Sequence, residues 1–159
     1  TLSQISKEKN TKSLCTYCGV LRRRILNSMA RELGADKLAI GHNLDDTCEM
    51  YLLNIIRNEP ERLVRYIKPV ISDRGLVPRI RPFMAVSKLD IQHYADIHKL
   101  KYVVGRCPYA KYSLRFATRT SIKEWEEKFP GTMNKMYKSM LKMISAYGQA
   151  MDVKKSTFR

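Results

Sequence analysis

The sequence predicts an α/β domain built on a parallel sheet, with further helices toward the C-terminus. A short apolar segment at 37–41 runs into polar residues and then into a helical pattern. A second apolar segment at 101–105 leads into a turn and another helical pattern, and helical patterns separate the two segments. This alternation is typical of a parallel sheet. Two strands are too few for a complete sheet, so we expect further strands near 66–71 or outside this chain.

The N-terminal elements follow from local patterns. Residues 1–14 read as a polar lead-in. Leu21, Ile25, Met29 and Leu33 recur at helical spacing and predict a helix over 20–33 that stops at Gly34. A second helix is expected over 44–58. Its expected apolar face comprises Leu44, Cys48, Leu52, Ile55 and Ile56.

The rest of the chain divides at its prolines. Residues 59–86 are expected to be irregular, because four prolines interrupt them. Ser87 and Asp90 stand three residues apart, as in a capping box, and predict a helix over 87–100. Helices are expected over 112–128 and 132–149. The last carries a broad apolar stripe, which comprises Met133, Met136, Tyr137, Met140, Leu141, Ile144 and Tyr147.

Positive charge is the strongest signal in the composition. The 159 residues include 30 Lys and Arg against 15 Asp and Glu, a formal net charge of +15. The windows 9–31 and 97–123 contain no acidic residue at all. Such a domain favours a polyanionic partner, nucleic acid first and an acidic membrane surface second, although a merely soluble basic surface is the alternative. No apolar run approaches the roughly 20 residues of a membrane helix, and we expect a cytoplasmic protein.

The cysteines suggest metal or sulfur chemistry. Cys15 and Cys18 form a C-x-x-C pair, and Cys107 stands in the second acid-free window. This pattern does not indicate a disulfide framework. If 101–105 is a strand, Cys107 follows its end and would meet the pair at one edge of the sheet. Three thiolates suit a zinc site completed by His42, a [4Fe–4S] cluster with one open iron, or redox chemistry. Cys48, on an apolar helix face, is expected to be buried.

The segment AIGHNLDD places polar residues at the end of the first strand. In open α/β sheets, ligands bind outside the carboxyl ends of the strands. Gly41 permits close approach of a ligand, and Asp45 and Asp46 can hold Mg²⁺. The same acids stand in the first turn of a helix, where carboxylates cap the helix and complement its dipole. Both roles remain open, although the adjacent His42 favours a functional site.

Several stretches together resemble the tRNA 2-thiolation enzymes, which include the wobble-uridine thiolases of archaea and eukaryotes. These stretches are CTYCGVLRR, GADKLAIGHNLDD, RPF, CPYA and FPGTM, in the family's order and within residues 13–149. The resemblance implies an adenine nucleotide alpha-hydrolase-like domain of the N-type ATP pyrophosphatase kind. It also implies the reaction: ATP adenylates O2 of a uridine in tRNA, and sulfur then displaces AMP to leave 2-thiouridine.

The resemblance assigns the sulfur-handling residues and the partners. Cys15, Cys18 and Cys107 match the ligands of a [4Fe–4S] cluster, and Cys15 and Cys107 are also expected to be catalytic. The implied partners are tRNA and a sulfur donor, either free sulfide or a ubiquitin-like sulfur carrier. Homodimers are common in the family, and a homodimer is one expectation here.

The resemblance also assigns the nucleotide site. Asp46 matches the family's catalytic acid. Gly41, His42 and Asp45 fall where ATP and Mg²⁺ are bound. Arg22 stands where a basic residue is expected to contact phosphates or RNA, although relatives carry Lys there and the two side chains are not equivalent.

Two family features do not occur in these 159 residues: the phosphate-binding loop S-G-G-x-D-S and the flanking zinc-finger cysteines. The amides of that loop cradle the pyrophosphate. We therefore expect the C-terminal part of a catalytic domain, with a helical region at about 111–150, that does not adenylate alone. Two alternatives stay open: a nucleic-acid-binding module with a structural zinc site, and a thiol or persulfide sulfur carrier without a cluster.

Overall fold

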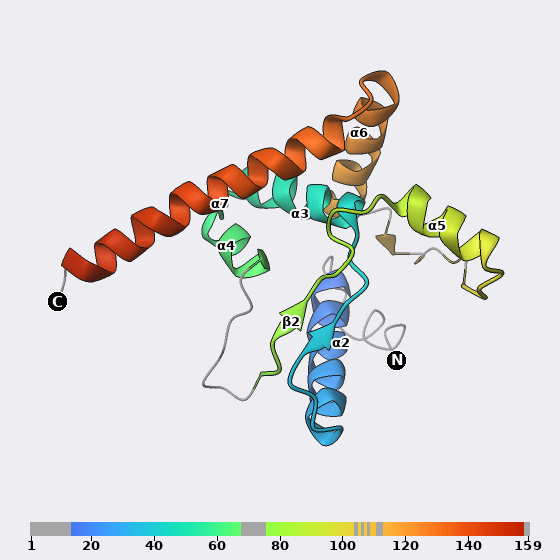
Figure 1. The fold of residues 1–159 in the computed structure, drawn as a ribbon, viewed down its shortest axis with the longest axis horizontal. Coiled ribbons are helices and arrows are strands. Elements are labelled where there is room, and N and C mark those ends of the chain that lie inside the picture. Colours follow the sequence, from blue (N-terminus) through green and yellow to red (C-terminus); the bar gives the residue numbers. More distant parts are fainter. Residues whose placement is uncertain are drawn as a thin grey trace.

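The fold is seen in a computed structural model that describes residues 14–67, 76–103, 105, 107, 109–110 and 113–157. Figure 1 shows α3, α4 and α6 gathered along α7, with α2 and two short strands below them. In order, the elements are α2 (Leu14–Glu32), β1 (Leu38–Ala39), α3 (Leu44–Ile56), α4 (Glu61–Ile67), β2 (Arg79–Ile80), α5 (Lys88–Ile97), α6 (Leu114–Lys128) and α7 (Thr132–Thr157). Of the expected polar lead-in, residues 1–14, the structure describes only Leu14, which begins α2.

The two strands pair in parallel, as the α/β class requires. Leu38 lies opposite Arg79, and the Ile40 amide donates to the Ile80 carbonyl at 3.0 Å. The strand predicted within 37–41 is confirmed, but its partner is not the segment 101–105. Residues 101–103 form no strand, and Val103 is 95% exposed. The apolar, β-branched pattern of the segment 101–105 is typical of a strand. Among the described residues, however, no strand pairs with this segment.

Helix α2 begins earlier than predicted, so it includes both cysteines of the C-x-x-C pair. The apolar spacing does extend back through Cys18 to Leu14, once Cys18 is counted as apolar. The predicted stop at Gly34 is confirmed, because its φ of 64° is the left-handed conformation that favours glycine. The amides of Gly34 and Ala35 bond back to the carbonyls of Arg31 and Ala30, which is a Schellman motif.

The core lies where α3 meets α4, α6 and α7. One cluster of buried residues comprises Met50, Leu63, Met140 and Ile144. A second comprises Leu44, Cys48 and Ile122. The expected face of α3 was wrong at its C-terminal end, because Ile55 and Ile56 are 41% and 54% exposed. Helix α3 turns Met50 and Leu53 inward instead, so that the buried face follows α7 rather than the sheet.

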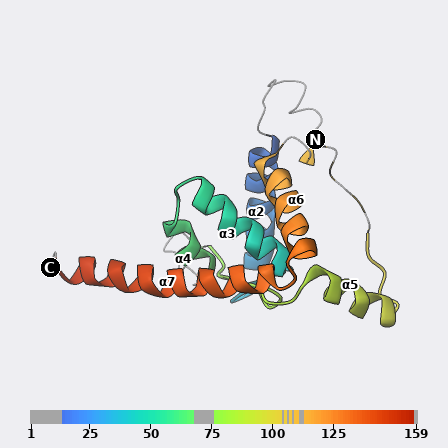
Figure 2. The same ribbon diagram turned by 90° about the horizontal axis from the view of Figure 1, so that it is seen from above.

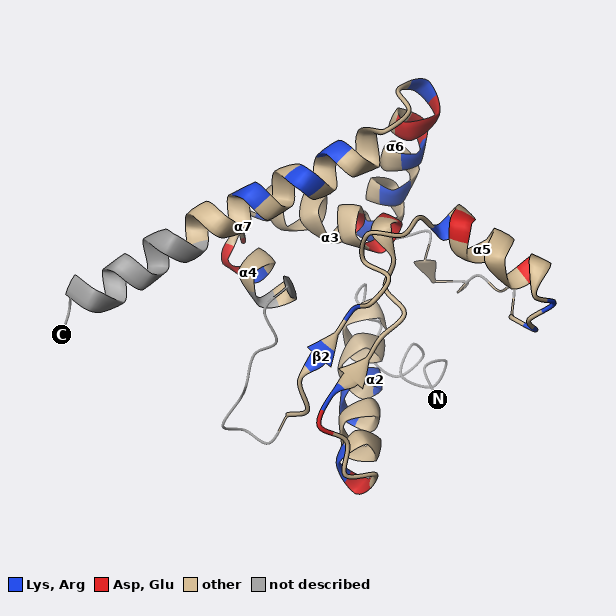
Figure 3. Cartoon of the chain, in the orientation of Figure 1, with Lys and Arg blue, Asp and Glu red and all other residues tan. Residues whose placement is uncertain are grey.

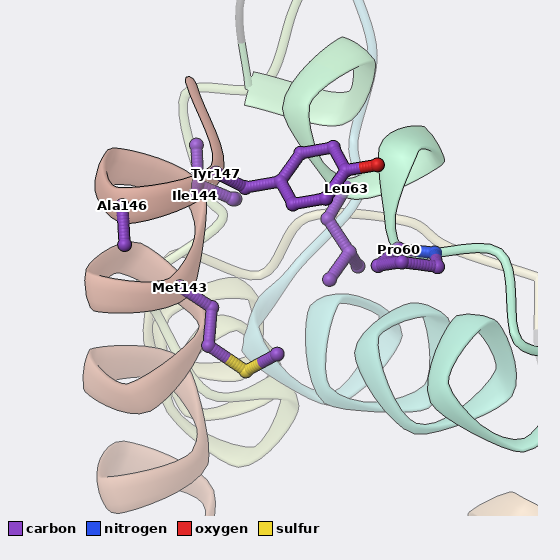
Figure 4. Close-up of a pocket in the computed structure, with 6 residues that line it drawn as sticks. All are labelled: Pro60, Leu63, Met143, Ile144, Ala146 and Tyr147. Atoms are coloured by element: carbon purple, nitrogen blue, oxygen red, sulfur yellow. The ribbon is translucent and has the colours of Figure 1, made fainter. Parts of the chain in front are cut away.

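The region 59–86 is not irregular throughout. It contains α4, which follows Pro60, and β2, which stands between Pro78 and Pro82. Residues 66–67, where a strand was expected to begin, belong to α4, and 68–71 lie outside the described residues. Helix α4 meets α7 across a mostly apolar pocket of about 340 Å³ (Figure 4). The pocket is lined by Pro60, Leu63, Met143, Ile144, Ala146 and Tyr147.

The remaining helix starts agree with the capping signals. The Ser87 hydroxyl accepts from the Asp90 amide at 3.1 Å at the start of α5, and the Ser113 hydroxyl accepts from the Phe116 amide at the start of α6. Figure 2 shows α7 as one long rod alongside α4 and α3; it extends beyond the predicted end at 149. No helix in the described part of the chain is both long enough and apolar enough to cross a bilayer.

Leu63→Ala is expected to lower the free energy of unfolding by about 2–5 kcal/mol. The reason is that Leu63 is 1% exposed and fills the space between α4 and α7. Urea unfolding measures the change. The control is Leu89→Ala on α5, the same substitution at a 66% exposed side chain, which should cost less than about 0.5 kcal/mol. Equal losses in the two variants would contradict this description of the core.

Candidate functional site

The candidate site lies at the carboxyl edge of the two-stranded sheet. Gly41 and His42 follow β1, and Arg81 follows β2, so the parallel pairing brings these residues to one edge. A Cβ atom built on Gly41 would meet nothing within 4 Å, which leaves open space beside its backbone. This is the edge at which open α/β sheets bind ligands.

Asp46 takes part in the cap of α3. Its Oδ2 accepts from the Asn43 amide at 3.3 Å, and the Asn43 side chain accepts from the Asp46 amide at 3.0 Å, which completes a capping box. Its Oδ1 lies 3.8 Å from Nη2 of Arg119. Because a carboxylate offers about four lone pairs, these contacts leave acceptor capacity. The capping role is therefore real, and it does not exclude a second role.

Asp45 caps a different helix. Its Oδ2 accepts from the backbone amide of Lys88 at 2.9 Å, the first residue of α5. The Leu44 amide donates to the Val86 carbonyl at 2.9 Å beside it. The two acids in the first turn of α3 therefore cap two helix starts: Asp46 caps α3 itself, and Asp45 caps α5.

Sequence reasoning missed a buried ion pair next to Asp46. Glu49, one turn along α3, is 1% exposed. It accepts from Nε and Nη2 of Arg119 on α6, at 2.5 Å and 3.2 Å, and lies 4.0 Å from Nε of Arg115. The hydrogen bond that Arg119 donates to Glu49 is the main cause that raises the pKa of Arg119. The available signal was a carboxylate in the apolar part of α3, beyond the acids of its first turn, because a buried charge needs a partner.

His42 is half-buried among cations. In the described residues its Nδ1 atom is buried and has no hydrogen-bond partner. Burial first of all lowers the pKa of His42, and the charges of Arg81, Arg115 and Arg22 lower it further, whereas Asp46 raises it. The imidazole is therefore largely neutral at pH 7. Three arginines from α2, α6 and the end of β2 thus lie near one neutral ring.

Arg81 is stacked on a tyrosine. Its guanidinium carbon lies 4.0 Å from the centre of the Tyr66 ring, and Nη1 donates to the Tyr66 carbonyl. Among the described residues its Nε is buried without a partner, and burial is the main cause that lowers the pKa of Arg81. The Tyr66 hydroxyl lies 3.3 Å from the Thr47 hydroxyl, which donates to the Asn43 carbonyl. These contacts tie α4, the end of β2 and the cap of α3 together.

The cysteines are free thiols with different exposures. Cys15 and Cys107 are exposed, Cys18 is intermediate, and Cys48 is buried, as expected for Cys48. Figures 1 and 2 both place the N-terminal end of α2, which carries Cys15 and Cys18, near the N-terminal end of α6, which follows the turn of Cys107. Cys107 does not follow the end of a strand as predicted, since 101–103 is no strand. Cys107 instead begins a turn closed by the Ala110 amide at 3.0 Å.

The described residues contain no group of three or more His, Cys, Asp or Glu side chains close enough to hold a metal ion. A ligand set of Cys15, Cys18 and Cys107 therefore stays a prediction. The charges of three arginines act on His42, and its ring lies edge-on to Tyr66. A zinc site completed by His42 gains no support from this arrangement.

Comparisons with known proteins give a consistent result. Residues 2–124 match the PP-loop domain. The chain is 38% identical over 130 residues to cytoplasmic tRNA 2-thiolation protein 1 of Chlamydomonas reinhardtii, covering 82% of this chain and 36% of that protein. It is 34% identical over 153 residues to a probable sulfurtransferase of Methanocaldococcus jannaschii, covering 91% and 45%. The chain thus spans less than half the length of these relatives.

A solved structure is also similar. It is the U34-tRNA thiolase NcsA from Methanococcus maripaludis with its [4Fe–4S] cluster, at a TM-score of 0.72 and 30% sequence identity. The similarity covers 87% of this chain and 46% of that one.

Arg119→Met is expected to lower the free energy of unfolding at pH 7 by about 3 kcal/mol. Glu49 would then stay buried without its two hydrogen bonds. Denaturant unfolding at pH 7 measures the change. In the control, Arg62→Met breaks an exposed pair with Glu59 and should cost at most about 1 kcal/mol. Equal losses in the two variants would argue against the buried pair.

Cys48 is expected to be the slowest of the four thiols to alkylate. Burial first of all, and then three nearby carboxylates, raise the pKa of Cys48 to about 12, so the thiolate is scarce at pH 8. Mass spectrometry after timed iodoacetamide treatment of the reduced, metal-free protein should find Cys15 and Cys107 modified first. Cys48 should react fully only in denaturant. Equal rates for Cys48 and Cys107 in the folded protein would refute the burial of Cys48.

Proposed function

The chain belongs to the PP-loop domain family, and from that premise we propose that it is the C-terminal part of the catalytic domain of a tRNA-uridine 2-sulfurtransferase. The reaction is adenylation of uridine O2 in tRNA by ATP, followed by replacement of that oxygen with sulfur to give 2-thiouridine. The names of the eukaryotic relatives support a cytoplasmic location.

The observation that carries the proposal is the position of the GHNLDD segment. It leaves the carboxyl end of β1 and brings Gly41, His42 and Asp46 to the edge where β2 ends. The chain is 30% identical to a tRNA thiolase of similar fold. This similarity supports the proposal that the carboxyl edge of the sheet is the catalytic site.

We propose that Gly41, His42 and Arg22 contact ATP, while Asp45 and Asp46 hold Mg²⁺. The open space beside Gly41 admits a ligand, and the cations near His42 suit phosphate groups. Carboxylate oxygens are donors that Mg²⁺ prefers, and the ion would offset charge on the phosphates. The residues present therefore fit the group. Adenylation also needs phosphate-binding amides of the S-G-G-x-D-S kind, which these 159 residues lack.

In this site Asp46 is proposed as the catalytic acid, and Glu49 is proposed to position it through Arg119. The Arg119 guanidinium bonds to the buried Glu49 and lies 3.8 Å from Asp46, so it limits where the Asp46 carboxylate can turn. A neutral imidazole has one nitrogen that donates a hydrogen bond and one that accepts, so the ring of His42 can orient a ligand by either kind of bond.

Cys15, Cys18 and Cys107 are proposed to hold a [4Fe–4S] cluster, with Cys15 and Cys107 closest to the sulfur transfer. Thiolates are the ligands that iron–sulfur clusters require, and these three are free and at least partly accessible. When bound, a cluster with three protein ligands supplies one open coordination position for sulfur.

The partners follow from the same proposal. The net charge of +15 suits tRNA, whose phosphates attract Lys and Arg without regard to sequence. The sulfur donor is free sulfide or a ubiquitin-like carrier, and the enzyme acts as a homodimer.

Cys15→Ala, Cys18→Ala or Cys107→Ala in the intact protein is expected to abolish 2-thiouridine formation, with tRNA affinity within about twofold of the unmodified protein, because the thiols carry no phosphate contact. Mass spectrometry of digested tRNA measures the product. Cys48→Ala, which removes a buried thiol outside the proposed set, is the matched control and should retain thiolation. Normal 2-thiouridine in any of the first three variants would remove that cysteine from the site.

Metal analysis of anaerobically purified protein separates the alternatives. Iron with acid-labile sulfide, lost in each of the three variants, supports the cluster. Colourless protein with one zinc and no turnover supports a structural zinc module instead. Active, metal-free protein that carries a persulfide on Cys15 or Cys107 supports a sulfur carrier without a cluster.

A further inference from the structure

A second basic feature lies along α2, away from the carboxyl edge of the sheet. It is a hollow of about 730 Å³ between the C-terminal half of α2 and the segment that enters β2. Figure 3 shows Lys and Arg on α2 and on β2 where the two elements lie next to each other. The lining residues are Arg23, Arg24, Asn27, Ser28, Arg31, Glu32, Leu76 and Arg79. We call this feature the arginine hollow.

Among the described residues, the arginine hollow has more positive charge than its neighbours neutralise. Four of the described lining residues are arginines and one is an acid. None of the ion pairs found among the described residues includes any of the four. Glu32, the acid, accepts a hydrogen bond from the Ser28 hydroxyl at 3.0 Å. Burial, and after it the charge of Arg23, lowers the pKa of Arg79. The arginines therefore repel one another at a cost that an anion would relieve.

The walls of the arginine hollow are held in place. The Asn27 side chain accepts from the Val77 amide at 2.8 Å, which fastens the segment before β2 to α2. Nε of Arg23 donates to the Gly19 carbonyl at 2.9 Å, so this guanidinium lies along the helix. The Schellman motif at Gly34 fixes the end of α2. The hollow is thus organised before any ligand arrives, which lowers the entropy cost of binding.

The lining favours backbone phosphates over a nucleotide. Guanidinium groups match phosphate oxygens in a bidentate manner. The described lining includes no aromatic ring, and its apolar side chain is Leu76, so these residues offer a base no ring on which to stack. The hollow also shares α2 with Cys18 and Arg22. From Cys18 to Arg31 the helix rises about 20 Å, a span suited to an extended polyanion rather than a small anion.

We propose that the arginine hollow binds backbone phosphates of the RNA substrate and thereby holds that RNA along α2. This inference rests on the proposed function for the identity of the RNA. The hollow supplies affinity without reading sequence, while the residues at the carboxyl edge of the sheet carry out the reaction.

The test is Arg24→Gln/Arg31→Gln/Arg79→Gln in the intact protein, with tRNA binding measured from 50 to 300 mM salt. The affinity at low salt should fall about tenfold or more. The slope of log K against log salt should become shallower by about two to three, because three phosphate contacts are lost. ATP binding should be unchanged. The double variant Arg24→Gln/Arg31→Gln leaves β2 intact and should show about two thirds of the change in slope.

A matched control separates a site from general charge. Lys135→Gln/Lys138→Gln/Lys142→Gln removes the same charge from exposed positions of α7 and should alter affinity and slope much less. If the α7 variant loses as much as the arginine variant, or if both arginine variants keep the original slope, the arginine hollow is not the RNA site. Competition by ATP or inorganic phosphate at millimolar levels would also overturn the proposal, since it would identify a small-anion site.

The two proposals fail separately. Unmodified protein that binds tRNA through the hollow but forms no 2-thiouridine with ATP and sulfide contradicts the proposed function and leaves the hollow supported. Unmodified protein that thiolates tRNA, while the arginine variants bind it normally, contradicts the hollow alone.

Discussion

The buried carboxylate of Glu49 constrains the arrangement around it. A charge at 1% exposure is tolerated only with a partner, and that partner is Arg119 on α6. The pair therefore joins α3, which begins at the end of β1, to the helix that follows the turn of Cys107. Arg119 also lies beside Asp46, so the packing of two helices and the orientation of a proposed catalytic acid depend on one guanidinium. A substitution there changes stability and chemistry together, which is why binding and turnover need separate measurement.

The start of α3 shows how a structural role and a chemical role can share atoms. Capping and metal binding both use acceptor lone pairs on Asp45 and Asp46. The capping bonds fix the two side chains without exhausting their oxygens. A carboxylate already oriented by the backbone loses less entropy when it binds a ligand. The two roles considered for these acids are therefore compatible rather than exclusive.

Local physics made much of the fold predictable. Gly34, Ser87 and the GHNLDD segment each carry signals that act within a few residues, and the structure confirms the helix ends and the first strand. The partner of that strand was not predictable, because β2 is two residues long and stands between prolines, whereas 101–103 resembles a better strand. Strand pairing depends on distant chain segments that no local pattern encodes. Glu49 was missed for a related reason, since its partner lies 70 residues away.

The hydrogen bond from the Lys88 amide to Asp45 has a thermodynamic consequence. A cation that shares this carboxylate with the Lys88 amide would withdraw electron density from its oxygens, and the cap of α5 would weaken without being displaced. Formation of the first turn of α5 and cation binding to Asp45 and Asp46 are then coupled equilibria. The coupling is reciprocal: cation binding destabilises the capped start of α5 by the same free energy by which the formed cap weakens cation binding. A helix outside the sheet edge thereby reports whether that edge is filled, and amide hydrogen exchange at the first turn of α5 would register it.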